Sequence, residues 1–497
     1  MNSLKSLKNI VSKLTEDENK ILLKILNYNN ISKNESKSIQ LINFLLSKNN
    51  YSINDIQNYI YGKSNYNAFN KLLNRTKYKI FETIIFDLSI LSNNFSKRNK
   101  VNIDLRKKLL QADILQLKGL RSEVLPIYNH IIIRSKFFEL YDIQVQALIS
   151  KQRLQLINAK VISFKKINEE INYAEKCLNA LKDSNYIYNE IINKINNSTN
   201  YLLYIDDLKL FINKLEKYYN IYKSPTIGFY LYTLSAEMFE NKLMYNKAKE
   251  NLEKVKGILI NNESAYTENR YGTVLLNLSN NNIFLFQFNQ AIILANESKK
   301  YFKNLPLTLK IVDEILFYTY FYKFDFLNCN KILIDSIIKF DDEAMKNKFQ
   351  YFQSCLFFIT GKYKDSLSAL LNYNEIERDK EGWNINRRIL LILIRIELQE
   401  YESVDLQIQN LDRFIKRISK NKIITQRHVI ILRILTKLIQ ENYNFNFVYQ
   451  KRLKYFKLLE SNYSQYEWQI KSPELIIFND WFKYKMKKNI INSSLDF

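Results

Sequence analysis

Five aromatic residues in the second half of the chain recur at a nearly fixed interval, and each is followed three positions later by a small or medium residue. The five pairs are Tyr245/Ala248, Phe288/Ala291, Phe326/Cys329, Tyr363/Ser366 and Tyr401/Val404. The steps between the aromatics are 43, 38, 37 and 38 residues. Each aromatic follows a short polar or glycine-containing break between two helical stretches. A fixed period of this size is typical of stacked helical repeats and predicts an α-solenoid.

The composition agrees with a chain built from helices alone. Only 7 Gly and 4 Pro occur in 497 residues, whereas sheets and hairpins need such residues for their turns. The hydrophobic fraction of 46% is ample for folding. We therefore expect an all-α fold in which each repeat buries its apolar face against its neighbours.

Each repeat is expected to contain a first helix A, a short break and a second helix B. The aromatic would pack into the crossing of the two helices, and the small residue would let them approach. The segment Gly361 to Ser366 resembles the central part of a tetratricopeptide repeat. The observed steps exceed the usual length of about 34 residues, so the helices or loops must be longer than in the standard repeat.

Four regions follow from this pattern. Residues 1–100 form a helical N-terminal region with a capping box at Thr15 and Glu18, and Ser92 to Lys100 form a polar linker. Residues 101–227 contain irregular helical hairpins, with a turn at Gly119. Residues 228–418 form the regular tetratricopeptide-like array. Residues 419–497, with Trp468 and Trp481, form a C-terminal helical cap.

Two segments carry a family resemblance. Residues 105–115 (LRKKLLQADIL) with 118–120 (KGL), and residues 11–20 (VSKLTEDENK), resemble segments of large tetratricopeptide-like proteins of Bacteroidota. The resemblance implies a helical repeat fold over most of the chain. It implies no activity and carries no catalytic residue.

The sequence offers no catalytic or metal-binding pattern, so we expect no enzyme activity and no cofactor. The two histidines, His130 and His428, lie on apolar stretches and are expected to be helix-packing residues. The motifs of zinc proteases, serine hydrolases and P-loop ATPases are missing. Three scattered cysteines fit a reducing cytoplasm, and no apolar run is long enough to span a bilayer.

The formal net charge is +24, from 74 Lys and Arg against 50 Asp and Glu. Such a charge favours attraction to nucleic acid, anionic membranes or acidic proteins. AT-rich codons also favour Lys, so surplus lysines on solvated faces explain the same number. The composition leaves both explanations open.

One candidate for nucleic-acid contact lies between Ser52 and Leu73. Ser52 is a plausible helix N-cap, Gly62 lies in a turn, and the whole has helix-turn-helix proportions. Amides and cations are the groups that meet base edges and phosphates. The second helix would present Asn67, Asn70, Lys71, Asn74, Arg75 and Lys77.

A second candidate is a basic helix face near the end of the array. Arg413, Lys416, Arg417 and Lys420 recur at three- and four-residue spacing and therefore share one face. This stripe would hold phosphates or an acidic partner segment. Further cations continue it at Lys422, Arg427, Arg433 and Lys437.

These features favour a non-catalytic scaffold or adaptor that binds a partner protein or peptide on its repeat surface. The alternative is a nucleic-acid-binding regulator that uses the N-terminal hairpin or the basic face. No membrane-spanning segment is expected, and the cytoplasm is the expected location.

Overall fold

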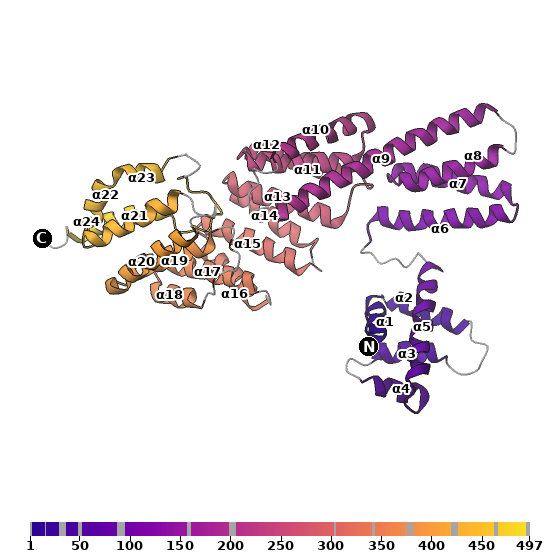
Figure 1. Ribbon diagram of the computed structural model, residues 1–497, viewed down its shortest axis with the longest axis horizontal. Coiled ribbons are helices and arrows are strands. Elements are labelled where there is room, and N and C mark those ends of the chain that lie inside the picture. Colours follow the sequence, from indigo (N-terminus) through magenta and orange to yellow (C-terminus); the bar gives the residue numbers. More distant parts are fainter. Residues whose placement is uncertain are drawn as a thin grey trace. The chain divides into compact units, whose positions relative to one another are not determined.

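The computed structural model describes residues 2–14, 16–28, 36–47, 52–86, 95–156, 161–197, 205–302, 305–339, 343–372, 375, 379, 382–418, 426–461 and 466–493. Over these residues the chain forms twenty-four α-helices and no strand, which confirms the predicted all-α class (Figure 1). The helices belong to two compact units. The first comprises Met1–Asp183, Ser224–Thr226 and Asn261–Thr267, and the second comprises Ser184–Lys223, Ile227–Ile260 and Glu268–Phe497.

The first unit begins with five helices that share one apolar core. They are α1 (Asn2–Lys13), α2 (Glu16–Tyr28), α3 (Lys37–Ser47), α4 (Ile53–Tyr61) and α5 (Tyr66–Phe86). Ser52 caps α4 as predicted: its Oγ accepts from the Asp55 amide at 3.2 Å, and the Asp55 carboxylate accepts from the Ser52 amide at 2.7 Å. Gly62, at φ 68°, ends α4. The capping box expected at Thr15 lies outside the described residues.

Three further helices of the first unit pack in sequence, and a fourth leads out of it. These are α6 (Lys97–Leu117), α7 (Arg121–Phe137), α8 (Tyr141–Leu156) and α9 (Val161–Asn197). The polar linker was predicted to extend to Lys100, and this boundary is wrong. Ser96 accepts from the Asn99 amide and caps α6, which begins at Lys97. The predicted turn at Gly119 is present, with φ 79°.

The second unit contains the repeat array, preceded by α10 (Ile205–Tyr222). The A helices are α11 (Pro225–Asn241), α13 (Glu268–Phe284), α15 (Pro306–Tyr322), α17 (Glu343–Ile359), α19 (Trp383–Glu397) and α21 (Gln426–Gln440). The B helices are α12 (Tyr245–Asn261), α14 (Phe288–Lys299), α16 (Phe326–Lys339), α18 (Tyr363–Leu371), α20 (Tyr401–Ile418) and α22 (Phe445–Lys451). Each of the five predicted aromatics is the first residue of a B helix, which confirms the helix pairs.

The small residues lie where the two helices of a pair cross. Their exposed fraction is 0% in all five repeats. Ser279 Oγ donates to the Ala291 carbonyl at 2.7 Å, and Ser354 and Ser366 each donate to the other's carbonyl at 2.8 Å. In both crossings the partners are twelve residues apart. The short side chains therefore permit the close approach that the sequence predicted.

Each turn between A and B uses a left-handed residue two positions before the aromatic. These residues are Leu243, Phe286, Phe324, Gly361 and Gln399, with φ between 56° and 75°. The following residue donates its amide to a carbonyl five positions earlier, as Asp325 does to Tyr320 at 2.9 Å. This is the Schellman arrangement of a helix C-terminus. The turn is therefore fixed by hydrogen bonds although only one repeat has glycine there.

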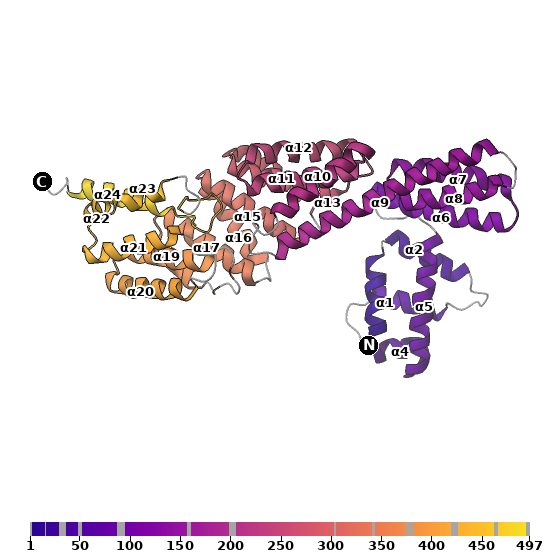
Figure 2. The ribbon, with the colours of Figure 1, turned by 45° about the horizontal axis from the view of Figure 1, so that its top comes forward.

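The unit ends with a sixth helix pair and two further helices. Phe445 begins α22, and Val448, three positions later, is fully buried. The chain continues through α23 (Leu453–Leu459) to α24 (Phe478–Ser493), which packs against α22 (Figure 2). None of the helices in the described ranges is both long enough and apolar enough to span a bilayer.

Candidate binding surface on the A helices

A non-helical segment between α23 and α24 lies across the A helices of the second unit. We call residues 466–477 the strap. Its side chains and main chain bond to residues of four A helices: Asn280 of α13, Tyr322 of α15, Tyr351 of α17 and Arg427 of α21. This side of the A helices is thus occupied by a segment of the chain itself.

Two tyrosines hold the main chain of the strap. The Tyr351 hydroxyl donates to the Pro473 carbonyl at 2.7 Å, and the Tyr322 hydroxyl accepts from the Lys471 amide at 3.2 Å. Lys471 also extends its ammonium to the Asn280 side-chain oxygen. Tyr322 packs edge-on against Trp468, with ring centroids 5.8 Å apart. The strap turns at this point, with Lys471 at φ 67° and the Ser472 amide donating to the Gln469 carbonyl at 3.0 Å. Both tyrosines contact main-chain groups, which are the same for every residue type except proline.

Arg427 anchors the second part of the strap. Its guanidinium forms a bidentate pair with Glu474 at 2.6 and 2.7 Å. It also donates to the Leu459 carbonyl, the Tyr466 carbonyl and the Asn479 side chain at 2.9 to 3.0 Å. The residue is 4% exposed. The prediction that Arg427 continues a surface stripe is therefore wrong: it is a buried hub that ties α23, the strap and α24 to α21.

Glu397, the last residue of α19, anchors α24. Its side chain is 3% exposed, and it accepts from the Trp481 indole at 2.7 Å and from the Lys485 ammonium at 3.0 Å. Tyr363 is hydrogen-bonded to the same carboxylate. Burial, together with the charge of Glu397, raises the pKa of Tyr363 to about 12. The phenol therefore stays protonated across the physiological range.

Two half-buried carboxyls lie on α11, Glu237 and Glu240, and the second interacts with Lys471 of the strap. Burial and the neighbouring Glu237 raise the pKa of Glu240 to about 7, while an Asn281 side-chain bond and the charge of Lys471 partly offset this. Burial also raises the pKa of Glu237. Glu240 therefore changes charge near neutral pH, beside the strap.

The cysteines of the array and the two histidines differ in their surroundings. Burial raises the pKa of Cys329 to about 12 and also raises that of Cys355. His428 is a buried packing residue as predicted, and burial lowers its pKa to about 4. His130, by contrast, is exposed beside the Lys108 ammonium at 3.1 Å, so its expected packing role is wrong. Within the described ranges, no three His, Cys, Asp or Glu residues gather as metal ligands.

The structure brings the predicted hairpin residues onto α5. Asn67, Lys71, Asn74 and Arg75 are exposed, and Asn70 is half-buried. Lys77 is also half-buried, and it donates to Ser6 Oγ of α1 at 2.9 Å. The exposed members remain candidates for nucleic-acid contact, whereas Lys77 also serves to join two helices.

The predicted basic face lies on α20, where Arg413, Lys416 and Arg417 are exposed. Lys416 pairs with Asp412 at 2.6 Å, and the Arg417 guanidinium lies 5.2 Å from the Phe414 ring. Lys420 lies outside the described residues. The face therefore carries less unpaired charge than its sequence spacing indicates.

The strap is the feature that the sequence did not predict. Its residues were expected to be part of a helical cap, and Trp468 and Trp481 were the only signals in that region. Trp468 donates its indole N–H to the Glu474 carbonyl at 2.8 Å, and Trp481 donates to Glu397. Both tryptophans thus fix the strap and α24: the partner of Trp468 lies six residues away within the strap, and that of Trp481 lies 84 residues away on α19.

No protein-family model and no curated protein sequence matches the chain. Among solved structures, it is similar to the apo form of RapI, with 12% identity and a TM-score of 0.42 over 77% of this chain and 98% of RapI. It is also similar to a signal transduction ATPase with numerous domains that has a tetratricopeptide repeat sensor, from Pyrococcus horikoshii. In that case the identity is 11% and the TM-score 0.30, over 91% of this chain and 65% of the other.

Proposed function

We propose that this chain is a non-catalytic, cytoplasmic scaffold that binds an extended segment of a partner protein on the A-helix face of its second unit. The observation that carries the proposal is the capture of the strap by side-chain bonds to its main chain. Tyr322, Tyr351 and Arg427 bond to main-chain amide and carbonyl groups, which a partner's peptide also presents. The same groups suit a segment from another protein.

The strap divides into a shallow and a deep part. In residues 466–472, Gln469 is exposed, Trp468 and Lys471 are half-buried, and Ile470, at 8% exposed, is the one buried residue. From Pro473 onward, Glu474 and Leu475 are 6% and 3% exposed. We infer that a partner segment takes the place of residues 466–472, while Glu474 and Arg427 keep α24 in position.

The non-catalytic part of the proposal is supported by the surroundings of the reactive groups. Raised thiol pKa values at Cys329 and Cys355 keep these sulfurs protonated and poorly nucleophilic. The cytoplasmic location is supported by Cys177, Cys329 and Cys355, which are all free and buried.

The test is affinity capture from the native cell with two forms of the tagged chain, each with and without nuclease. The second form has residues 466–472 replaced by seven Gly and Ser residues. We expect it to capture more of a defined protein, because the face is no longer occupied, and we expect nuclease to leave that protein bound. A synthetic peptide of residues 466–477 should compete it off.

A single change, Gln469→Gly, is the matched control, since this side chain is exposed and should not affect capture. Circular dichroism checks that both variants stay folded. Equal capture by the two forms would contradict the proposal. Nuclease-sensitive capture would instead favour the nucleic-acid regulator, through the exposed residues of α5.

A further inference from the structure

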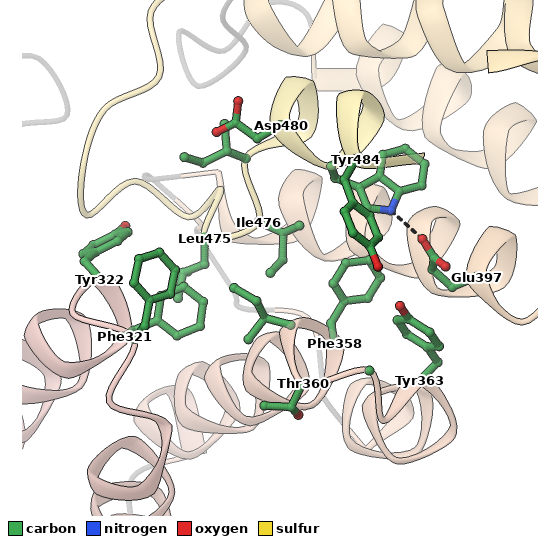
Figure 3. A pocket seen from close by; sticks show the side chains of 15 residues that line it. Phe321, Tyr322, Phe358, Thr360, Tyr363, Glu397, Leu475, Ile476, Asp480 and Tyr484 are labelled. Carbon is green, nitrogen blue, oxygen red and sulfur yellow. Dashed lines mark hydrogen bonds between the residues drawn. The ribbon is translucent and has the colours of Figure 1, made fainter. Parts of the chain in front are cut away.

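A cavity of about 640 Å³ lies between the repeats and the C-terminal segment (Figure 3). One wall consists of the ends of α15, α17 and α19 with the turn that starts α18. The other consists of strap residues Leu475 to Ile477 and the first turns of α24. The volume falls within the range of about 300–1,000 Å³ that small-molecule sites occupy. The cavity shares Tyr322 with the proposed partner site, but none of residues 466–472 lines it. A ligand here is therefore an inference beyond the proposed function.

The inner part of the cavity is apolar and aromatic. Phe321, Phe358, Leu475 and Trp481 line it and are 3% to 7% exposed. Rings of this kind bury a ligand's apolar body well, and their faces attract a cationic group. We therefore expect a ligand with an aromatic or aliphatic body.

The polar corner of the cavity consists of Glu397, Tyr363 and Tyr484, which Figure 3 shows close together. The Glu397 carboxylate accepts from Trp481 and Lys485, and the Tyr363 hydroxyl donates to it. Each carboxylate oxygen can accept about two hydrogen bonds, so this corner still offers acceptors. A ligand must bring a donor to meet them.

The charge of the lining points in the same direction. The fifteen lining residues include Glu397 and Asp480 but no Lys or Arg, although the chain has 74 Lys and Arg against 50 Asp and Glu. Lys485 bonds to Glu397 and offsets its charge, but it does not line the cavity. Asp480, which is exposed, is the other acid of the lining, and its carboxylate points away from the aromatic side chains (Figure 3). An anionic ligand would meet these carboxylates with no cation in the lining.

We propose that this cavity binds a small apolar molecule whose polar end is a hydrogen-bond donor, with an organic amine as the preferred class and the corresponding carboxylate excluded. The amine N–H would bond to the Glu397 and tyrosine oxygens while its body lies against Phe321 and Phe358. The ligand joins the repeats to α24, so it stabilises the folded unit by mass action.

A matched series of probes tests this inference: 4-phenylbutylamine, 4-phenylbutanol and 4-phenylbutyrate share one body and differ in their polar end. Calorimetry on the full chain should show the amine binding at least about tenfold more tightly than the carboxylate, with the alcohol between them. Thermal unfolding should shift upward in the same order. Equal binding of amine and carboxylate, or no binding of any probe at millimolar concentration, overturns the proposal.

Two variants locate the site. Ile476→Trp fills the cavity from the strap side and should abolish amine binding. Ile359→Lys places an ammonium at an exposed position of the lining, 39% exposed, and should reverse the order of amine and carboxylate without affecting the fold. Glu402→Gln, at an exposed acid of α20 outside the lining, is the control and should change nothing. Unchanged binding in Ile359→Lys would place the probes elsewhere.

Discussion

The burial and the partners of Arg427 could not be predicted from the local sequence. It follows the basic run of α20 at a helical spacing, and a charge pattern assigns it to the same exposed face. In the structure all five N–H groups of its guanidinium have protein acceptors, and the side chain is buried. Its partners lie 32 to 52 residues away in sequence. No local pattern contains that information, because the ion pair depends on how the chain returns to α21.

We predict that Arg427→Met destabilises the second unit by about 3–5 kcal/mol, because Glu474 is left buried without its counter-charge. Lys437→Met, on the same helix, is the matched control. Its pair with Glu441 at 2.6 Å is about one-fifth exposed and should contribute far less than the buried pair.

Urea unfolding followed by circular dichroism measures both changes. The double variant Arg427→Met/Glu474→Leu should recover much of the loss, because no buried charge remains unpaired. Equal effects of Arg427→Met and Lys437→Met would show that the buried pair has no special role.

The raised pKa of Glu240 predicts that the stability of the second unit depends on pH. Its folded-state pKa of about 7 lies above the ordinary value of 4.5, so the folded chain keeps a proton that the unfolded chain has lost. The stabilisation of the folded state by this bound proton is therefore fully present below pH 4.5, and it is lost as the pH rises to about 7. Its size is about 3 kcal/mol, from 1.36 kcal/mol for each unit of pKa difference.

Glu240→Gln removes this titration. The urea midpoint of the wild type should fall between pH 5 and pH 8 by more than that of the variant, and the variant should be the more stable protein at pH 8. Glu250→Gln, at an exposed position of the next helix, should follow the wild type. A parallel fall in the Glu240→Gln variant and the wild type would contradict this origin of the pH dependence.

Among the helices, the repeat pairs were predictable because the aromatic and the small residue recur within one helical turn of each other. The small residue packs within its own pair, as in the Ser354–Ser366 contact. The expectation that each aromatic packs only into its own crossing is wrong, because Tyr245 stacks on Phe284 and Phe288 on Tyr322 of the following A helix. The left-handed turn residues were not predictable, since Leu243, Phe286, Phe324 and Gln399 are not residue types that favour positive φ. Their conformation follows from the hydrogen bonds of the helix end rather than from their own preference.

Replacing a helical glycine by alanine is expected to have opposite effects on stability at two positions. A Cβ at Gly272 of α13 would lie 2.7 Å from the Tyr301 Cβ and 2.9 Å from the Phe302 ring, so Gly272→Ala should destabilise by about 1–3 kcal/mol. A Cβ at Gly257 of α12 meets nothing within 4 Å. Gly257→Ala should therefore stabilise by about 0.5–1 kcal/mol.

Thermal unfolding of the two variants beside the wild type measures these effects. The pair is informative because the substitution is the same in both. If both variants lower the melting temperature, the close approach of α13 to Tyr301 and Phe302 does not explain the effect of Gly272→Ala.

The strap could not be predicted from local helical patterns either. Its sequence contains no helical period, and its position depends on Tyr322 and Tyr351, which are more than one hundred residues away. Its place at the end of the array predicted a terminal cap, as expected for a repeat protein. The cavity beside Glu397 depends on the same return of the chain and could not be predicted either.

For the whole molecule, the fold does not assign the net charge of +24 to any single surface. The exposed cations of α5 and α20 are only a small part of 74 Lys and Arg residues. A charge spread over the surface attracts polyanions without a dedicated site. The resemblance to Bacteroidota repeat proteins likewise stays a prediction, because it concerns helical hairpins alone.

Binding to a DNA duplex of random sequence distinguishes diffuse attraction from a dedicated site. Each phosphate contact contributes about −0.9 to the slope of log affinity against log salt. If the attraction is diffuse, Lys71→Glu/Arg75→Glu on α5 and Arg413→Glu/Arg417→Glu on α20 should each reduce the slope by at most about 2. Neither double variant should abolish binding, and fluorescence anisotropy at several salt concentrations measures both. A loss of binding confined to the α5 variant, with circular dichroism unchanged, would instead assign nucleic-acid recognition to the α4–α5 hairpin. Since both variants change the net charge equally, such a difference could come only from where the charges lie.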